Sequence, residues 1–145
     1  MALQSARLFC DGASRGNPGP ASAGAVVYDA LTGEVAAEIS RSLGVATNNV
    51  AEYQALLLGL EETLKLGATR VAIFADSQLL VRQLTGRYQV RHPDMRRLWG
   101  QAKSLLERFE SWQASHVPRE QNAEADRLAN LALDEEKKKP GRGAA

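Results

Sequence analysis

Four acidic residues lie in four separate sequence contexts, each suited to holding a carboxylate at a functional site. Asp11 lies in CDGASRGNPGP, Glu52 in TNNVAEYQAL, Asp76 in IFADSQLLV and Asp126 in QNAEADRLAN. Carboxylates brought together repel and raise one another's pKa, so such a cluster is expected to bind cations. Oxygen ligands without His or Cys favour Mg²⁺ or Mn²⁺ over Zn²⁺. These residues predict a site for two hard metal ions, which can support phosphodiester cleavage.

The elements that must position these acids follow from the hydrophobic pattern. Three strands, two of them joined as a hairpin, precede a helix, a strand, two helices, a further strand and a last helix. The expected ranges are 6–10, 22–29 and 34–43 for strands, 48–66 for a helix, 69–75 for a strand, 77–85 and 93–109 for helices, 112–117 for a strand and 123–137 for a helix. This order predicts an α/β fold with a mixed sheet and helices packed on it.

The acids fall at positions from which they can converge. Asp11 and Asp76 each come directly after an expected strand, so adjacent strands would bring them to one end of the sheet. Glu52 is expected in the first turn of its helix, where small residues such as Gly59 on the same face allow close approach to the sheet. Asp126 comes early in the last helix and approaches from a fourth direction.

Length and composition favour one globular domain. The chain has 145 residues, 44% of them hydrophobic and 24% charged, which argues against global disorder. No apolar stretch approaches the roughly 18 residues of a membrane span, and the N-terminal sequence lacks an export signal. Cys10 is the only cysteine, which fits a reducing cytosol and core packing. We expect a cytoplasmic monomer without membrane association.

Basic residues gather locally although the net charge is only +1. Arg82, Arg87, Arg91, Arg96 and Arg97 crowd one segment, and lysines at 137–139 open the C-terminal tail. These groups are suited to meeting phosphates, and equally to solvating a helix face and a tail. We expect a domain over residues 1–137 and a disordered basic tail over 138–145.

The four acidic blocks, in this order and spacing, resemble those of type 1 ribonuclease H proteins, and the match runs from about Arg7 to Leu133. The resemblance implies a five-stranded mixed sheet of order 3-2-1-4-5. It assigns Asp11, Glu52, Asp76 and Asp126 as metal ligands for two Mg²⁺ ions, with Mn²⁺ as a substitute. The implied reaction is endonucleolytic cleavage of the RNA strand of an RNA–DNA hybrid, leaving 5′-phosphate and 3′-hydroxyl ends.

The resemblance also implies a substrate groove. Amide side chains there can both donate to and accept from the 2′-hydroxyls that distinguish RNA from DNA, and Thr47 matches a residue that helps to bind a DNA-strand phosphate. The residues that match the groove are Gly12, Ser14, Asn17, Thr47, Asn48, Asn49 and Gln78. Turn and helix-cap chemistry is the alternative explanation for Asn17, Asn48 and Asn49.

Two departures from the family pattern stand out. Many members carry a mobile histidine before the last acid, and in the shortened segment HVPREQNAEAD that position is taken by Arg119. We expect Arg119 to substitute as a charge near the leaving phosphate, and His116 to be a strand residue. The basic insertion that some members carry after the third acid is absent, since the stretch from Leu79 to Trp99 is too short for it. Affinity for the hybrid is therefore expected to be weaker than in members with the insertion, and strongly salt dependent.

Two other functions compete with this hypothesis. Resolvases, transposases and integrases share the general fold, but the NPGP loop and the TNNVAEYQAL block favour ribonuclease H. A non-catalytic module that binds hybrid would be expected if a metal ligand were missing, and all four acids are present.

Overall fold

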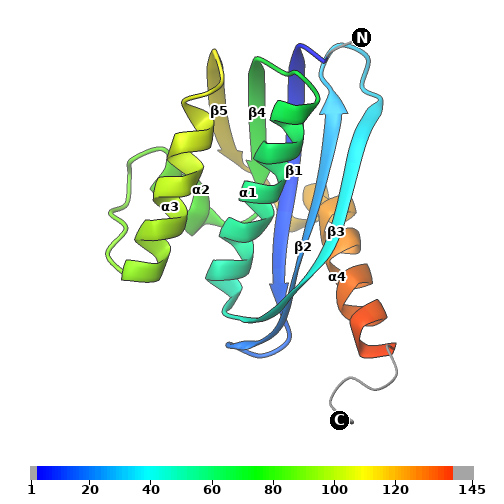
Figure 1. Cartoon of the computed structure of the whole chain (residues 1–145), viewed down its shortest axis with the longest axis vertical. Coiled ribbons are helices and arrows are strands. Elements are labelled where there is room, and N and C mark those ends of the chain that lie inside the picture. The colour runs from blue at the N-terminus through cyan, green and yellow to red at the C-terminus, as the bar shows by residue number, and fades with distance from the viewer. Residues whose placement is uncertain (1–2, 139–145) are drawn as a thin grey trace.

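A computed structural model describes residues 3–138 of the chain, with the elements in the order expected. Figure 1 shows strands β1 to β5 side by side in one sheet, with helices on both sides. The elements are β1 (Ser5–Ser14), β2 (Gly19–Asp29), β3 (Val35–Ala46), α1 (Asn48–Lys65), β4 (Arg70–Ala75), α2 (Gln78–Leu84), α3 (Pro93–Leu106), β5 (Ser111–His116) and α4 (Ala123–Lys138), with a 3₁₀ turn at Arg119–Asn122 before α4.

The sheet has the order β3-β2-β1-β4-β5, which confirms the predicted five-stranded arrangement. β1, β2 and β3 pair antiparallel, whereas β4 pairs parallel to β1 and β5 parallel to β4. The parallel strands need crossovers, which α1 provides before β4 and α2 and α3 provide before β5. As a result the carboxyl ends of β1, β4 and β5 point to one edge of the sheet.

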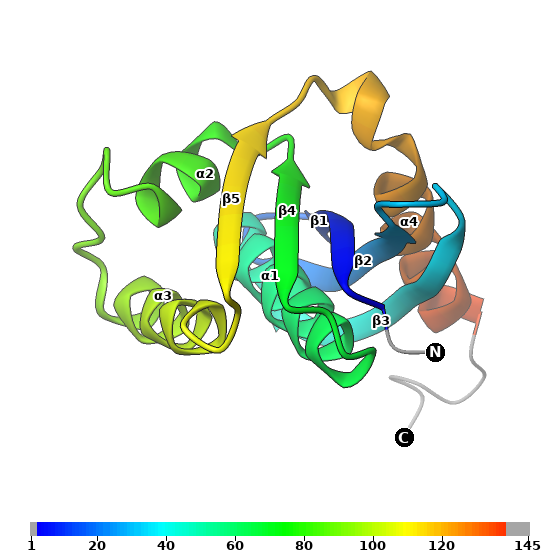
Figure 2. The same ribbon diagram turned by 90° about the horizontal axis from the view of Figure 1, so that it is seen from above.

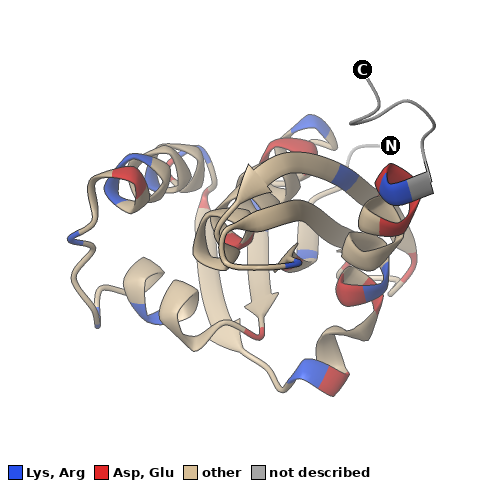
Figure 3. Cartoon of the chain, turned by 90° about the horizontal axis from the view of Figure 1, so that it is seen from below, with Lys and Arg blue, Asp and Glu red and all other residues tan. Residues whose placement is uncertain are grey.

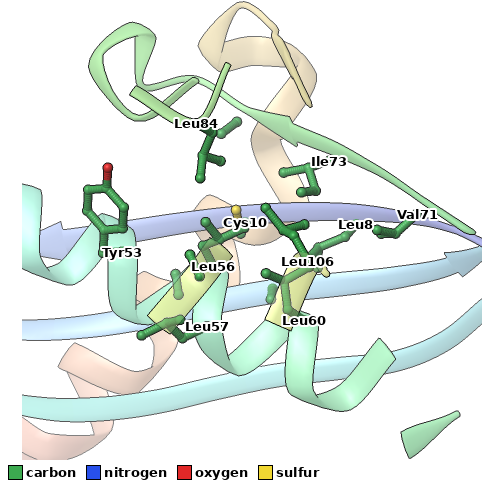
Figure 4. Packing of buried hydrophobic residues seen from close by; sticks show 14 of the residues in the cluster. Leu8, Cys10, Tyr53, Leu56, Leu57, Leu60, Val71, Ile73, Leu84 and Leu106 are labelled. Atoms are coloured by element: carbon green, nitrogen blue, oxygen red, sulfur yellow. The ribbon is translucent and has the colours of Figure 1, made fainter. Parts of the chain in front are cut away.

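Helices cover the two faces unequally. In Figures 1 and 2, α1, α2 and α3 lie on one face, and α4 lies on the other, against β2 and β3. The main core fills the space between the sheet and α1, where Leu8, Leu56, Leu60 and Ile73 are fully buried (Figure 4). Cys10 lies in this core, as predicted.

Helix α1 begins and ends as its sequence indicates. The Thr47 side chain accepts a hydrogen bond from the Val50 backbone N–H at 3.2 Å and so caps the N-terminus. Gly67, with a φ of 89°, follows the last turn in the left-handed conformation that glycine tolerates. The close approach of α1 to the sheet is also confirmed: a Cβ on Gly12 would lie 2.2 Å from the backbone carbon of Ala51.

Helix α4 is attached to the sheet by hydrogen bonds from serine hydroxyls. Ser22 Oγ donates to the Ala129 carbonyl and Ser40 Oγ to the Leu128 carbonyl, each at 2.6 Å. Leu128 is buried with Ala125, Ala129, Ala132 and Leu133, whereas Leu131 lies outside this buried stripe and is 40% exposed. The helix continues to Lys138, one residue beyond the expected boundary, and residues 139–145 of the expected tail lie outside the described part of the chain.

No helix within residues 3–138 is both long enough and apolar enough to cross a membrane.

Candidate active site

Three of the predicted acids meet at the carboxyl edge of the sheet. Asp11, Glu52 and Asp76 each offer a carboxylate oxygen, and these oxygens all lie within 4.8 Å of one another. They come from β1, α1 and the end of β4, so residues 65 positions apart share one site only through the fold. Asp11 and Glu52 are buried, with 6% and 5% of their surface exposed.

Asp11 does not follow its strand, as we expected, but lies inside it. β1 continues to Ser14 because its antiparallel pairing with β2 persists there, and Asp11 itself lies opposite Gly24. On its other side, the pairing of β1 with β4 ends at Phe9 and Phe74. Asp11 is therefore paired with β2 on one side and unpaired on the side of β4. Asp76, which follows the end of β4, lies on that unpaired side.

Glu52 is the fifth residue of α1 rather than part of its first turn, because the helix begins at Asn48. Its Oε1 accepts a hydrogen bond of 3.1 Å from the Gly12 backbone N–H, which fixes the carboxylate against β1. Its Oε2 is buried and has no hydrogen-bond partner among residues 3–138. An unpartnered buried carboxylate oxygen costs free energy, so this oxygen is positioned for a ligand.

Asp76 and Asp126 lie where the sequence placed them. Asp76 directly follows β4, and the next residue, Ser77, caps α2 through a 3.2 Å bond from the Leu80 N–H. Asp126 is the fourth residue of α4 and borders the same cavity as the three clustered acids. Asn130 donates to Asp126 Oδ1 at 3.3 Å and so orients this carboxylate from one turn further along the helix.

The carboxylates strongly perturb one another. The pKa of Asp11 is raised from 3.8 to about 10, mainly by burial and in addition by the charges of Glu52 and Asp76. Burial also raises the pKa of Glu52, against the opposing effect of its hydrogen bonds, including that from the Gly12 N–H. The site thus favours protons or cations over a cluster of free negative charges.

A cavity of about 410 Å³ opens over these acids and collects much of the predicted site. Gly12, Ser14, Asn48 and Arg119 line it together with Asp11, Glu52, Asp76 and Asp126. Four predicted groove residues do not line it, namely Asn17, Thr47, Asn49 and Gln78. Two of these have structural partners: Thr47 caps α1, and Asn17 Oδ1 accepts from the Asn48 N–H at 3.1 Å.

Other residues of the site escaped the sequence interpretation. Arg15, Ser77 and Asn130 line the cavity. Of these, only Asn130 could have been predicted from the sequence, because it lies one helical turn after Asp126. Asn122 was also missed: it is buried, and its Nδ2 donates to the Cys10 carbonyl at 2.9 Å. This bond ties the turn before α4 to the residue preceding Asp11.

Arg119 reaches the edge of the acidic cavity from the 3₁₀ turn. Its Nη2 lies 3.7 Å from Asp126 Oδ1, and the side chain is 77% exposed. Within residues 3–138, Asp11, Glu52 and Asp76 form no ion pair with a basic side chain. The negative charge of the cluster is therefore not neutralised by the protein's own cations.

These residues fit divalent metal ions. All the donors are carboxylate oxygens, which suit hard ions such as Mg²⁺ and Mn²⁺. A cation between the acids would give Glu52 Oε2 a ligand contact and would lower the pKa of Asp11 by stabilising its charged form.

Comparison with known proteins gives consistent relatives. A sequence-family model described as "Reverse transcriptase-like" matches residues 9–132. The bifunctional protein Rv2228c of Mycobacterium tuberculosis is 52% identical over 127 residues, which cover 88% of this chain and 35% of that protein. Ribonuclease HI of Halobacterium salinarum is 46% identical over 127 residues, covering 88% of this chain and 63% of that protein. The chain thus spans about a third of the mycobacterial relative and less than two thirds of the archaeal one.

Solved structures agree with these matches. The N-terminal RNase H domain of the mycobacterial protein, solved as a fusion with maltose binding protein, superposes with a TM-score of 0.86 at 49% identity, covering 88% of this chain and 98% of that chain. RNase H1 of Halobacterium salinarum gives a TM-score of 0.88 at 45% identity, with 90% and 98% covered. LC11-RNase H1, solved in complex with an RNA/DNA hybrid, gives 0.85 at 38% identity, with 90% and 97% covered.

The sheet order and the carboxylate cluster define an α/β protein of the ribonuclease H fold class with a site suited to hard divalent cations. With the matching family model and relatives of this similarity, the chain belongs to the type 1 ribonuclease H family.

Proposed function

We propose that the chain is an endoribonuclease that hydrolyses the RNA strand of RNA–DNA hybrids with two divalent metal ions, Mg²⁺ or in its place Mn²⁺. The observation that carries the proposal is the cluster of Asp11, Glu52 and Asp76, with Oε2 of Glu52 buried and unpartnered. Asp126, at the edge of the same cavity, is the fourth ligand. Bound ions of this kind supply activation of the attacking water and stabilisation of the leaving oxygen.

The protein's own groups hold and orient the reactants. The Gly12 N–H and Asn130 bond to one oxygen each of the Glu52 and Asp126 carboxylates, which leaves Glu52 Oε2 and Asp126 Oδ2 for the metal ions. Water adds to the scissile phosphorus and the P–O3′ bond breaks, which leaves a 3′-hydroxyl on one fragment and a 5′-phosphate on the other. No covalent enzyme intermediate is required.

The groove residues select the RNA strand. Ser14 and Asn48 line the acidic cavity and can bond to 2′-hydroxyls and phosphates there, with backbone groups of Gly12 beside them. We assign Asn17, Thr47, Asn49 and Gln78, which do not line this cavity, to contacts with the hybrid away from the reacting phosphate. A hybrid is the partner, and the protein acts as a monomer in the cytoplasm.

Arg119, at the cavity edge, stabilises the negative charge at the scissile phosphate as its 3′-oxygen leaves. Because its side chain is 77% exposed, solvent screens its effect, and Arg119→Ala is expected to lower kcat roughly fivefold, about 1 kcal/mol. Arg119→Lys keeps the charge and is expected to retain most of the activity. Unchanged kcat in Arg119→Ala would remove Arg119 from the mechanism.

Cleavage of an end-labelled RNA–DNA hybrid tests the proposal, beside single-stranded RNA and duplex DNA, with Mg²⁺, Mn²⁺ or chelator. We expect hybrid-selective, metal-dependent cutting that Asp76→Asn abolishes, with products carrying 5′-phosphates. Folded wild-type protein that binds hybrid but never cuts it would instead identify a non-catalytic binding module.

A further inference from the structure

A second polar cavity lies between α2 and β5, outside the acidic one. Its volume is about 390 Å³, and it shares no lining residue with the acidic cavity. Val81 and Ala114 form its apolar part. The polar residues that line it are Gln78, Arg82, Thr85, Arg87, Ser115 and His116.

The charge of this cavity is uniformly positive. Arg82 and Arg87 both line it, none of its described lining residues is acidic, and neither arginine forms an ion pair within residues 3–138. In Figure 3, α2 and the loop after it carry blue segments and no red ones. Two guanidinium groups without a carboxylate partner are suited to an anion, and their planar donors match the oxygens of a phosphate.

The arginine side of the cavity is held in place by the protein. The Arg82 guanidinium lies 5.2 Å from the centroid of the Tyr88 ring and donates to the Tyr88 hydroxyl. The backbone N–H groups of Arg87 and Tyr88 both donate to the Arg82 carbonyl, at 2.8 and 3.1 Å. The loop therefore folds back on α2 and places Arg87 at the cavity beside Arg82. Because these bonds already order the loop, binding a ligand costs less conformational entropy.

The cavity lies beside the acidic site along the same sheet edge. Ala75, which precedes Asp76, pairs with His116 of the cavity wall, and Gln78 follows Asp76 by two residues. In Figure 2 the tip of β4 lies between α2 and β5 on one side and the start of α4 on the other. A nucleic-acid strand with a phosphate at Asp76 can continue across the tips of β4 and β5, past Gln78, to the arginines.

We propose that this cavity is a phosphate subsite in which Arg82 and Arg87 hold one backbone phosphodiester of the strand that is cut at the acidic site. The inference rests on the proposed function for the choice of ligand. The subsite anchors the strand away from the reacting phosphate, and in this chain, which lacks the family's basic insertion, it supplies part of the grip on the hybrid.

Hybrid binding in an Asp76→Asn background with Mg²⁺ tests the subsite without cleavage. The double substitution Arg82→Gln with Arg87→Gln is expected to weaken binding about tenfold near physiological salt. It should also lower the slope of log Kd against log salt by about 0.9, the value for one lost phosphate contact. The matched control is Arg96→Gln with Arg97→Gln, which removes the same charge from exposed positions of α3 outside the cavity. The control is expected to change Kd less than twofold, and thermal melting checks that each variant is folded.

Neutral linkages identify the strand. A single uncharged methylphosphonate linkage is placed at successive positions along each strand of the hybrid. In the RNA strand the adjoining sugar is 2′-O-methylated, and the control carries the same 2′-O-methyl sugar with an ordinary charged phosphodiester. We expect one linkage of the RNA strand at which neutralisation weakens binding by the Asp76→Asn protein and has no effect once Arg82 and Arg87 are also replaced.

The outcomes separate this inference from the proposed function. Equal losses in the arginine pair and its control, or sensitivity confined to the DNA strand, would overturn the subsite. Wild-type protein that cuts no hybrid would overturn the proposed function, whereas the subsite is judged by binding alone.

Discussion

Asp11 is held in an environment that opposes its negative charge. It is 6% exposed, and burial together with Glu52 and Asp76 raises its pKa far above the ordinary value for an aspartate. In the protein without metal, this residue therefore reduces stability, so its role at the site is cation binding rather than folding.

Asp11→Asn is expected to stabilise the metal-free protein while removing detectable hydrolysis. The amide keeps the shape of the side chain but carries no charge, so the free energy of unfolding at neutral pH should rise by about 2 kcal/mol. Chemical denaturation in chelator measures this change. Asp94→Asn, at an exposed position in the first turn of α3, is the control and should cost at most about 0.5 kcal/mol. A less stable Asp11→Asn protein would contradict the assignment of Asp11 as a strained ligand.

Asn122 positions the last acid through the backbone. Its Nδ2 bonds to the Cys10 carbonyl, so its loss leaves a buried carbonyl without that donor and loosens the turn that leads into α4. We expect Asn122→Ala to lower the free energy of unfolding by about 2 kcal/mol and to reduce kcat, because Asp126 is less well placed beside Asp11. If kcat and KM were unchanged in the folded variant, Asn122 would have a purely structural role.

At the scale of the elements, the position of α4 depends on direct contact between its backbone and β2. A Cβ on Gly24 would lie 2.1 Å from the Ala125 carbonyl oxygen and 2.5 Å from the Ala129 nitrogen. Backbone atoms cannot move aside as a flexible side chain can. Since Gly24 also lies opposite Asp11 in the sheet, this contact fixes the distance between the helix that carries Asp126 and the strand that carries Asp11.

Gly24→Ala should therefore push α4 away from the sheet. We expect a loss of about 3 kcal/mol in the free energy of unfolding, and lower activity in the protein that remains folded. Gly100→Ala is the matched control, since beyond the adjacent helix backbone no atom of residues 3–138 lies within 4 Å of its added Cβ. Alanine also favours the interior of α3, so we expect a gain of about 0.5–1 kcal/mol. Equal stability of the two variants, measured by denaturant titration, would contradict this account of α4 packing.

The sequence predicted elements better than it predicted how they meet. Periodicity and turn residues correctly indicated the order of strands and helices, and the acidic blocks indicated which side chains share a site. The predicted end of β1 was wrong because a strand continues as long as one neighbouring strand pairs with it. At Asp11, β1 is still paired with β2 although its pairing with β4 has ended. The roles of Gly24 and Asn122 depend on α4 packing across the sheet, which no local pattern encodes.

At the scale of the whole molecule, folding brings acids from distant parts of the chain together, so stability and metal binding are linked through protons. Asp11 has a folded-state pKa of about 10 against 3.8 ordinarily, and Glu52 about 7 against 4.5. Between these values the folded protein binds more protons than the unfolded chain, so the free energy of unfolding falls as pH rises. The penalty is absent below about pH 4, and it grows through pH 7 for Glu52 and up to about pH 10 for Asp11.

In chelator, the wild-type protein should consequently unfold at a lower temperature at about pH 8 than at about pH 5.5, a loss on the order of 2–3 kcal/mol. Excess Mg²⁺ should restore most of this loss at the higher pH and have little effect at the lower pH, where protons occupy the acids. Thermal melting of the wild type beside Asp11→Asn isolates the site from the other titrating groups, because the variant lacks the main raised pKa. Identical pH profiles for the two proteins would show that the cluster holds its charges without penalty, and the coupling between protons and metal would then have no basis.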